Sequence, residues 1–270
     1  MEARRFSCLF LLLATVLLAH IAALAPARLG FAQEFRIETD IYVGDAEEPT
    51  SHTVTLFEKS AVYEFVDNPD QVIVYRQTSP EHPAQFILLD AATERRTDVD
   101  VERVTKLMEK LTAWAAEQDD ALLNFSAKPK FKETFDAETG SLTLANSEWT
   151  YRVATVAAND RAALDRYRRF TDCYAELTSM LYSSPPPGPR QALNAALAKH
   201  GVVPVEIRRT IGGDEKNVVR AVHLFTWRLS RDDRARLDEA QTQLANYKKV
   251  ENEAFIAARV KQDAVRGQSK

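Results

Sequence analysis

Short segments in which hydrophobic and polar residues alternate follow one another through the first third of the chain. In the first segment, Phe35, Ile37, Ile41 and Val43 are separated by more polar neighbours. A period of two is typical of a β-strand that buries one face. The same pattern predicts four more strands, at residues 53–57, 61–66, 71–76 and 85–89. The connections between them are too short for a crossover, so we expect antiparallel pairing.

Two long helices are predicted where apolar residues recur at spacings of three and four, at residues 98–118 and 159–182. Asn159 is expected to cap the second helix, since its side-chain oxygen can accept a hydrogen bond from the first turn. A proline-rich connector at 183–189 follows, and a shorter helix at 189–200 has proline at its start and glycine just after its end.

Three acids, Asp98, Asp100 and Glu102, fall in the first turns of the predicted helix at 98–118. Their spacing is compatible with a divalent-metal site, but it lacks the glycine and the terminal glutamate of an EF-hand loop. Carboxylates at this position also complement the positive end of the helix dipole. We therefore interpret them as helix-start residues, and the sequence predicts neither a metal nor another cofactor.

The second half of the chain adds further strands and one charged helix. Four strands are predicted, at residues 130–135, 148–156, 203–211 and 218–229, the last two forming a hairpin around Gly212 and Gly213. Ser230 and Asp233 form a capping-box pattern, and a charged helix is expected to run from there towards Ala264. This order of elements predicts an α+β fold in which helices pack on a curved antiparallel sheet.

The N-terminus predicts export. Arg4 and Arg5 precede an apolar run at residues 6–25, and small residues at positions 30 and 32 suit cleavage before Gln33. The alternative is an uncleaved inner-membrane anchor formed by the same run. Both interpretations place the remainder outside the cytoplasm, in the periplasm or secreted. We expect three segments: a leader at 1–32, an α+β domain at 33–229, and a C-terminal helix and tail at 230–270.

Composition and charge exclude several classes of function. The chain is 45% hydrophobic and 27% charged, as in ordinary globular proteins, and its net charge of −4 lacks the positive field that nucleic-acid binding needs. The 8 glycines provide no phosphate-binding loop, and no serine-hydrolase, zinc-helix or paired-cysteine motif occurs. The sequence therefore favours a protein that is not an enzyme.

Two single residues are candidates for chemistry. Cys173 is the one cysteine after the leader, and it shares an apolar helix face with Phe170 and Leu177, which favours a buried, inert thiol over a reactive one. His223 lies on the apolar face of a strand, where the more common role is a core histidine with one nitrogen bonded to the backbone. A hydrolase that uses His223 is the least favoured alternative.

Aromatic residues on the predicted strands suggest either a packed core or an apolar cavity on the concave face of a curved sheet. With His223, the cavity candidates are Phe86, Phe131, Phe135, Trp149, Tyr151, Phe225 and Trp227. Both alternatives place the same side chains inward, so the pattern leaves the choice open.

Several segments give the chain a resemblance to a known family. These are Val62-Tyr63-Glu64-Phe65, Phe86-Ile87-Leu88-Leu89-Asp90 and Val203-Pro204-Val205-Glu206-Ile207. Together with the order of elements, they resemble the outer-membrane lipoprotein carrier and sorting-protein superfamily. In addition, Ile41-Tyr42-Val43-Gly44-Asp45 resembles the opening of an uncharacterised family of exported bacterial proteins. The superfamily resemblance implies an open half-barrel closed by helices over an apolar cavity.

The leading functional hypothesis is a non-catalytic protein of the bacterial cell envelope that binds a lipid or another apolar ligand in the concavity of the sheet. The alternative is an envelope interaction module that binds a partner protein through its C-terminal helix, at residues 231–264.

Overall fold

The computed structural model describes residues 33–258, except 68–69, 77–82 and 214–217. The predicted leader, its alternative as an anchor at 6–25, and the end of the predicted C-terminal helix lie outside the described residues. Among the described helices, none has both the length and the apolar composition that a membrane span needs.

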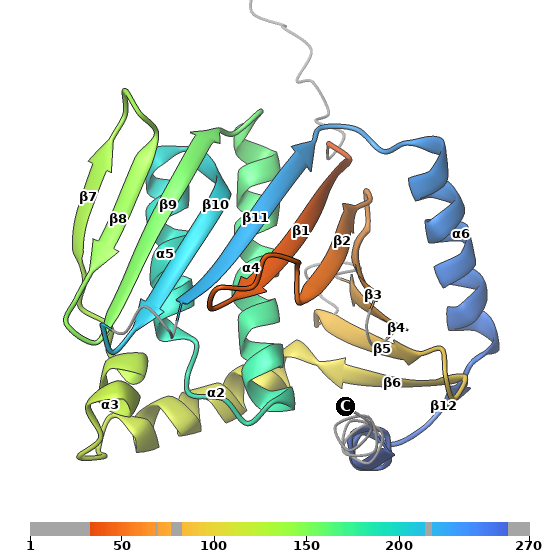
Figure 1. The fold of residues 1–270 in the computed structure, drawn as a ribbon. Helices are drawn as coiled ribbons and strands as arrows, with labels where there is room; N and C mark the ends of the chain where they lie inside the picture. Colours follow the sequence, from red (N-terminus) through yellow and green to blue (C-terminus); the bar gives the residue numbers. More distant parts are fainter. Residues whose placement is uncertain (1–32, 68–69, 77–82, 214–217, 259–270) are drawn as a thin grey trace, which may run out of the picture. The chain divides into compact units, whose positions relative to one another are not determined.

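A single mixed sheet of 12 strands dominates the fold (Figure 1). The first six strands are β1 (Phe35–Val43), β2 (Ser51–Phe57), β3 (Ala61–Asp67), β4 (Asp70–Arg76), β5 (Gln85–Asp90) and β6 (Arg95–Asp100). The other six are β7 (Lys132–Asp136), β8 (Ser141–Ala145), β9 (Trp149–Ala157), β10 (Val202–Ile211), β11 (Val218–Thr226) and β12 (Lys248–Lys249). Their spatial order is β12-β6-β5-β4-β3-β2-β1-β11-β10-β9-β8-β7, so the sheet is not closed into a barrel.

Antiparallel pairing joins every pair of neighbouring strands except β12 and β6, which are parallel. The sheet places the start and the end of the domain side by side, because β1 pairs with β2 on one side and with β11 on the other. The predicted strands and the hairpin of β10 and β11 are confirmed. Three strands were not predicted, β6, β8 and the two-residue β12.

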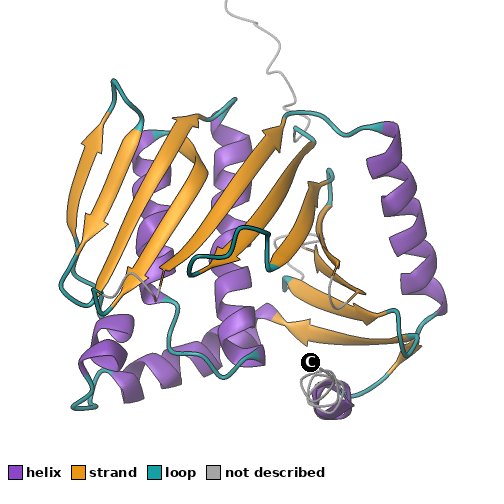
Figure 2. Cartoon of the chain, in the orientation of Figure 1, coloured by secondary structure: helices purple, strands orange, loops and turns teal. Residues whose placement is uncertain are grey.

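The helices are α2 (Val101–Ala115), α3 (Ala121–Ala127), α4 (Arg161–Leu181), α5 (Gly188–His200) and α6 (Arg231–Asn246). In the view of Figure 2, α4 and α5 lie behind the strands, α2 and α3 lie below them, and α6 lies at the right. The prediction for α5 is confirmed, including Gly201 in the left-handed conformation at its end, with φ of 70°. The capping box of Ser230 and Asp233 at the start of α6 is also confirmed.

Three predicted helix details are wrong. Residues 98–100 belong to β6, where Asp98 pairs with Arg96 at 3.0 Å instead of complementing a helix dipole. Asp160, and not Asn159, caps α4 by accepting a hydrogen bond from the backbone N–H of Ala163. The C-terminal helix stops at Asn246, because the chain then forms β12 and pairs with β6.

Alternation along the strands gives the sheet two apolar faces. The inner face packs against α2 and α4 in the largest core cluster, which includes Phe35, Phe57, Phe86 and Leu88 from the sheet and Tyr167, Phe170 and Leu177 from α4. Next to it, α5 covers β8, β9 and β10. On the outer face, α6 covers the strands from β2 to β5 through three buried residues, Leu237, Ala240 and Leu244.

Candidate functional site

Two adjoining cavities of about 550 and 450 Å³ lie on the inner face of the sheet, between its strands, α4 and the proline-rich connector to α5. We call them together the inner cleft. The two cavities share seven residues: Ile41, Ala175, Thr178, Tyr182, Arg190, Arg209 and Ala221. Three of them, Ala175, Thr178 and Tyr182, lie in or next to the C-terminal half of α4, so this part of the helix lines both cavities.

Strand register places the polar residues of the cleft. Thr39 on β1 lies opposite Thr53 on β2 and opposite His223 on β11. Because alternate residues of a strand point to the same face, the inward positions of β1 run from Ile37 through Thr39 to Ile41. A row of hydroxyl and imidazole groups thus crosses three neighbouring strands within an otherwise apolar wall.

His223 is held by this row. Its Nδ1 is 2.9 Å from Oγ1 of Thr39, whereas its Nε2 is buried and has no hydrogen-bond partner within the described residues. The bond partner is therefore a side chain, and not the backbone group that the sequence predicts. Burial, and to a smaller extent the nearby charge of Arg190, lowers the pKa of His223 to about 3, so the ring is neutral at physiological pH.

Glu64 is the acid of the cleft lining. It comes from β3, is only 6% exposed, and accepts a hydrogen bond from the Thr55 hydroxyl on β2. Burial raises its pKa to about 7, although hydrogen bonds from Thr55 and Thr53 act in the opposite direction. A buried carboxyl with this pKa is about half protonated near neutral pH.

Two arginines face the cleft from different elements. Arg209 is the inward residue of β10 between Ile207 and Ile211, and its guanidinium carbon lies 5.5 Å from the centre of the Trp149 ring. Arg190 lies in the first turn of α5 and hydrogen bonds with the buried Tyr167 of α4. Neither guanidinium forms an ion pair with an acid in the described part of the chain.

The remaining walls of the cleft are mainly apolar. Trp149, Tyr151 and Ile207 provide the sheet side of the larger cavity, and Leu122 with the prolines of the connector provides the other. Towards the smaller cavity, Phe170 continues the apolar surface on α4. The cleft thus combines an apolar lining with a small number of converging polar groups, the combination typical of small-molecule sites.

The structure brings together three of the eight cavity candidates. Trp149, Tyr151 and His223 line the inner cleft. The other five pack elsewhere: Phe86, Phe225 and Trp227 in the core beside α4, Phe131 against Phe125, and Phe135 stacked on His200. Sequence reasoning missed Arg190, Arg209 and Glu64 because each comes from a different element. Thr39 and Glu64 could have been recognised from the sequence, because each is a polar residue at an inward position of a predicted strand.

Cys173 is half-buried and packs against the main core, beside the hydroxyl of Tyr75. Burial raises the pKa of its thiol to about 11. A thiol with such a pKa carries almost no thiolate at neutral pH, which agrees with the predicted inert role.

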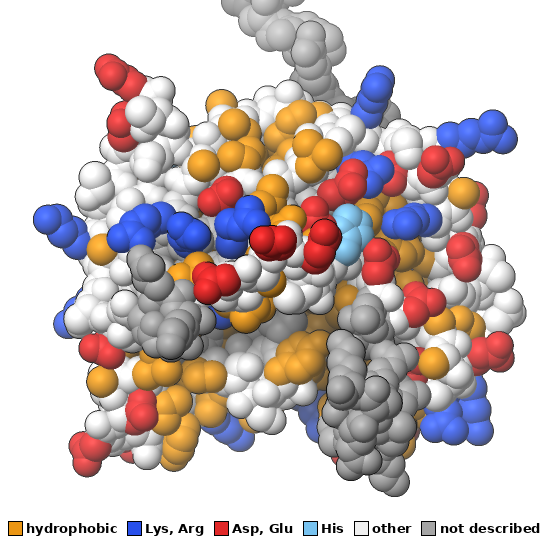
Figure 3. All heavy atoms as spheres, in the orientation of Figure 1, with side chains coloured by type: hydrophobic (Ala, Val, Ile, Leu, Met, Phe, Trp, Pro, Cys, Tyr) orange, Lys and Arg blue, Asp and Glu red, His pale blue; other side chains and the backbone are white. Residues whose placement is uncertain are grey.

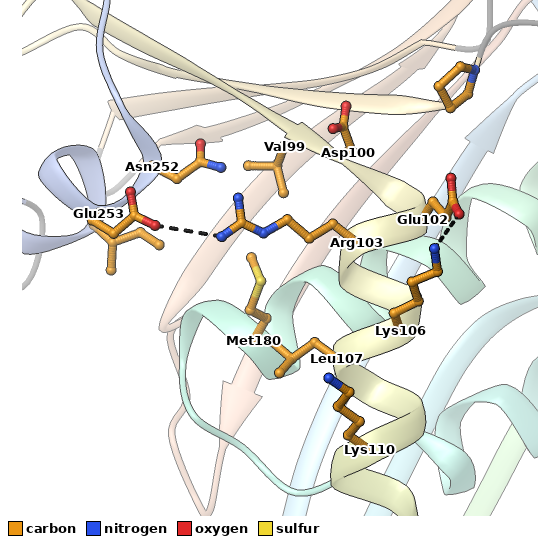
Figure 4. Close-up of a pocket in the computed structure, with 12 residues that line it drawn as sticks. Val99, Asp100, Glu102, Arg103, Lys106, Leu107, Lys110, Met180, Asn252 and Glu253 are labelled. Atoms are coloured by element: carbon orange, nitrogen blue, oxygen red, sulfur yellow. Dashed lines mark hydrogen bonds and ion pairs between the residues drawn. The ribbon is translucent and has the colours of Figure 1, made fainter.

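A further pocket of about 610 Å³ lies between α2 and the helical segment at 252–258 (Figure 4). Two of its three cations have partners: Arg103 lies 3.6 Å from Glu253, and Lys106 lies 2.5 Å from Glu102. These side chains are more than half exposed. The pocket therefore has the features of a solvated surface groove, and the inner cleft is the stronger candidate site.

On the outer face, the strands from β9 to β1 are open to solvent. Figure 3 shows a row of charged side chains across this face. Arg208 lies directly opposite Arg152 on one side and Arg220 on the other, and Arg220 packs 3.9 Å from the centre of the Tyr42 ring. On β10, Arg208 points to the exposed outer face and the next residue, Arg209, points to the inner cleft. Arg208 is therefore a matched control for substitutions of Arg209.

No family model matches the chain, and no curated protein does. Among the described residues, no three or more His, Cys, Asp or Glu side chains are grouped so that they could hold a metal ion.

Proposed function

We propose that the protein is an exported, non-catalytic protein that binds an apolar or amphipathic small molecule in the inner cleft. In this proposal the sheet acts as the wall of an open half-barrel, and α4 and α5 close its concave side. The observation that carries the proposal is the inner cleft itself, an interruption in the packing of helices against the inner face of the sheet.

The volumes support a small-molecule site. Cavities of about 550 and 450 Å³ fall within the range of roughly 300–1,000 Å³ common for ligand pockets. Trp149, Tyr151 and Phe170 supply aromatic surface, and Thr39, His223 and the arginines supply directed polar contacts. The protein has no need of a reactive group in such a role, since binding alone uses shape, apolar area and a few hydrogen bonds.

The alternative, an interaction module that docks through its C-terminal helix, receives less support. The apolar residues of α6 are buried against the sheet, so this helix has no uncovered apolar stripe with which to bind a partner.

Filling the cleft tests the proposal. Ala175 of α4 lines both cavities, and we expect Ala175→Phe to abolish binding of a fluorescent acyl probe while the thermal transition is retained. Native mass spectrometry of the wild-type protein should show a bound molecule, and lipid extraction should recover it. As a control, Ala154→Phe adds the same bulk on the exposed outer face of β9 and should leave binding unchanged. A wild-type protein that carries no ligand and binds no probe would refute the proposal.

A further inference from the structure

Two arginines inside the inner cleft form no ion pair within the part of the chain that the structure describes. Arg190 and Arg209 both line the two cavities, and no described carboxylate lies within ion-pair distance of either. Asp172 interacts electrostatically with Arg190, but it already accepts a hydrogen bond from Asn194 at 2.7 Å and lies 3.4 Å from Arg168. Burying positive charge without an opposite charge beside it costs free energy, and an anionic ligand in the cleft would remove that cost.

Buried polar atoms of the lining also lack hydrogen-bond partners among the described residues. Nε of Arg209 and Nε2 of His223 are buried without a hydrogen bond among the described residues. If Nδ1 of the neutral ring accepts the Thr39 hydroxyl proton, Nε2 carries a hydrogen and becomes a donor. The cleft then presents three hydrogen-bond donor groups: the guanidinium groups of Arg190 and Arg209 and the imidazole of His223. A negatively charged acceptor suits these three donors.

Arg190 lies at the end of α5 where the helix dipole disfavours a positive charge. It lies in the first turn, which is the positive end of the dipole. The same helix end and the guanidinium both favour an anion, so an anionic group in the cleft relieves the conflict. The acid of the lining, Glu64, does not perform this role, because its carboxyl is engaged by Thr55 and is not paired with either arginine.

We propose that the inner cleft binds a single-chain amphiphile whose anionic head group, a carboxylate or a phosphate, contacts Arg190 and Arg209 and whose hydrocarbon chain follows the apolar walls. This inference rests on the proposed ligand-binding function and names the class of ligand. Guanidinium groups bind both kinds of head group through paired charge-assisted hydrogen bonds. Trp149, Ile207 and the connector prolines line the adjoining apolar surface along which the chain lies.

Titration calorimetry with three probes of equal chain length tests this assignment. The probes are a fatty acid, a lysophosphatidic acid and an uncharged monoacylglycerol. We expect at least one anionic probe to bind the wild-type protein more tightly than the monoacylglycerol. A preference for the fatty acid identifies a carboxylate head group, and a preference for the lysophosphatidic acid identifies a phosphate. Equal affinity for all three probes would overturn the inference.

The variants separate charge recognition from loss of structure. Arg190→Gln with Arg209→Gln should weaken binding of the anionic probe roughly tenfold to a hundredfold and leave monoacylglycerol binding unchanged. Arg208→Gln, on the outer face of the same strand, should have no effect on any probe. An equal loss for charged and uncharged probes in the double variant would contradict a head-group role. If no probe binds the wild-type protein at all, the ligand-binding function itself fails together with the inference.

Discussion

A chain that ends at Leu229 is expected to lose its cooperative thermal transition and to aggregate. The truncation removes α6 and exposes eight apolar residues of the outer face, namely Val54, Leu56, Ala61, Tyr63, Val72, Val74, Ile87 and Leu89. It also removes Phe255, which is 4% exposed and belongs to the inner core. Calorimetry and light scattering of the truncated chain measure both effects.

Point substitutions in α6 give the same result in graded form. Leu237→Ala should lower the free energy of unfolding by about 2–5 kcal/mol, because it leaves a cavity between α6 and the sheet. Glu239→Ala, two residues away on the exposed side of the helix, should change it by less than about 0.5 kcal/mol. If the truncated chain instead kept its transition, α6 would be dispensable for the fold and the interaction-module alternative would gain support.

The second large effect concerns pH and Glu64. Its pKa in the folded protein, about 7, lies above its usual value of 4.5. The folded protein therefore binds more protons than the unfolded chain between these two pH values, and its stability falls as the pH rises through this window. The loss of folding stability is complete above pH 7. It amounts to about 3 kcal/mol, because each unit of pKa shift corresponds to about 1.36 kcal/mol.

Glu64→Gln should remove this loss, since the amide oxygen can still accept the Thr55 hydroxyl proton and has no charge to bury. We expect the variant to unfold at the same denaturant concentration as wild type at pH 4.5, and to be more stable by about 3 kcal/mol at pH 8. His223 acts in the opposite sense, because its lowered pKa removes stability as the pH falls below 6.5. His223 is present in both proteins, so its contribution cancels when the two free energies of unfolding are subtracted.

Glu109→Gln on the exposed side of α2 is the matched control, and it should change the free energy of unfolding by less than about 0.5 kcal/mol at pH 4.5 and at pH 8. A pH-independent difference for Glu64→Gln as well would contradict the assignment of the buried proton to Glu64.

Much of the fold was predictable because most strands bury one face and so alternate clearly. β6 was missed because its sequence is mostly charged, and only Thr97 and Val99 are buried on it. β8 was missed although Leu142 and Leu144 do alternate with more polar neighbours, so its signal was present. The sheet order could not be predicted, because the pairing of β1 with β11 joins segments that are about 180 residues apart.

The candidate site was predictable only in part. His223 was found because a histidine interrupts an apolar strand face, and Trp149 and Tyr151 because aromatic residues alternate on β9. Arg190 follows a run of prolines and Arg209 follows another arginine, so neither has a pattern that distinguishes it from surface charge. Their common position depends on how α5 packs beside β10, which is a property of the tertiary fold.

If an acyl chain occupies the inner cleft, its position can be measured by fluorescence quenching with a brominated fatty acid. Bromine atoms quench tryptophan only at short range, and the three tryptophans lie in different places. Trp149 lines the cleft, Trp114 is 49% exposed on α2, and Trp227 packs against Phe35 in the core.

A variant that retains only Trp149, made with Trp114→Phe and Trp227→Phe, should be quenched saturably at one fatty acid per chain. A variant that retains only Trp114 should be quenched no more than free tryptophan. Strong, saturable quenching of Trp149 is expected for an acyl chain in the inner cleft. Unquenched Trp149 at a concentration where calorimetry shows the fatty acid bound would place the ligand elsewhere and refute binding in the inner cleft.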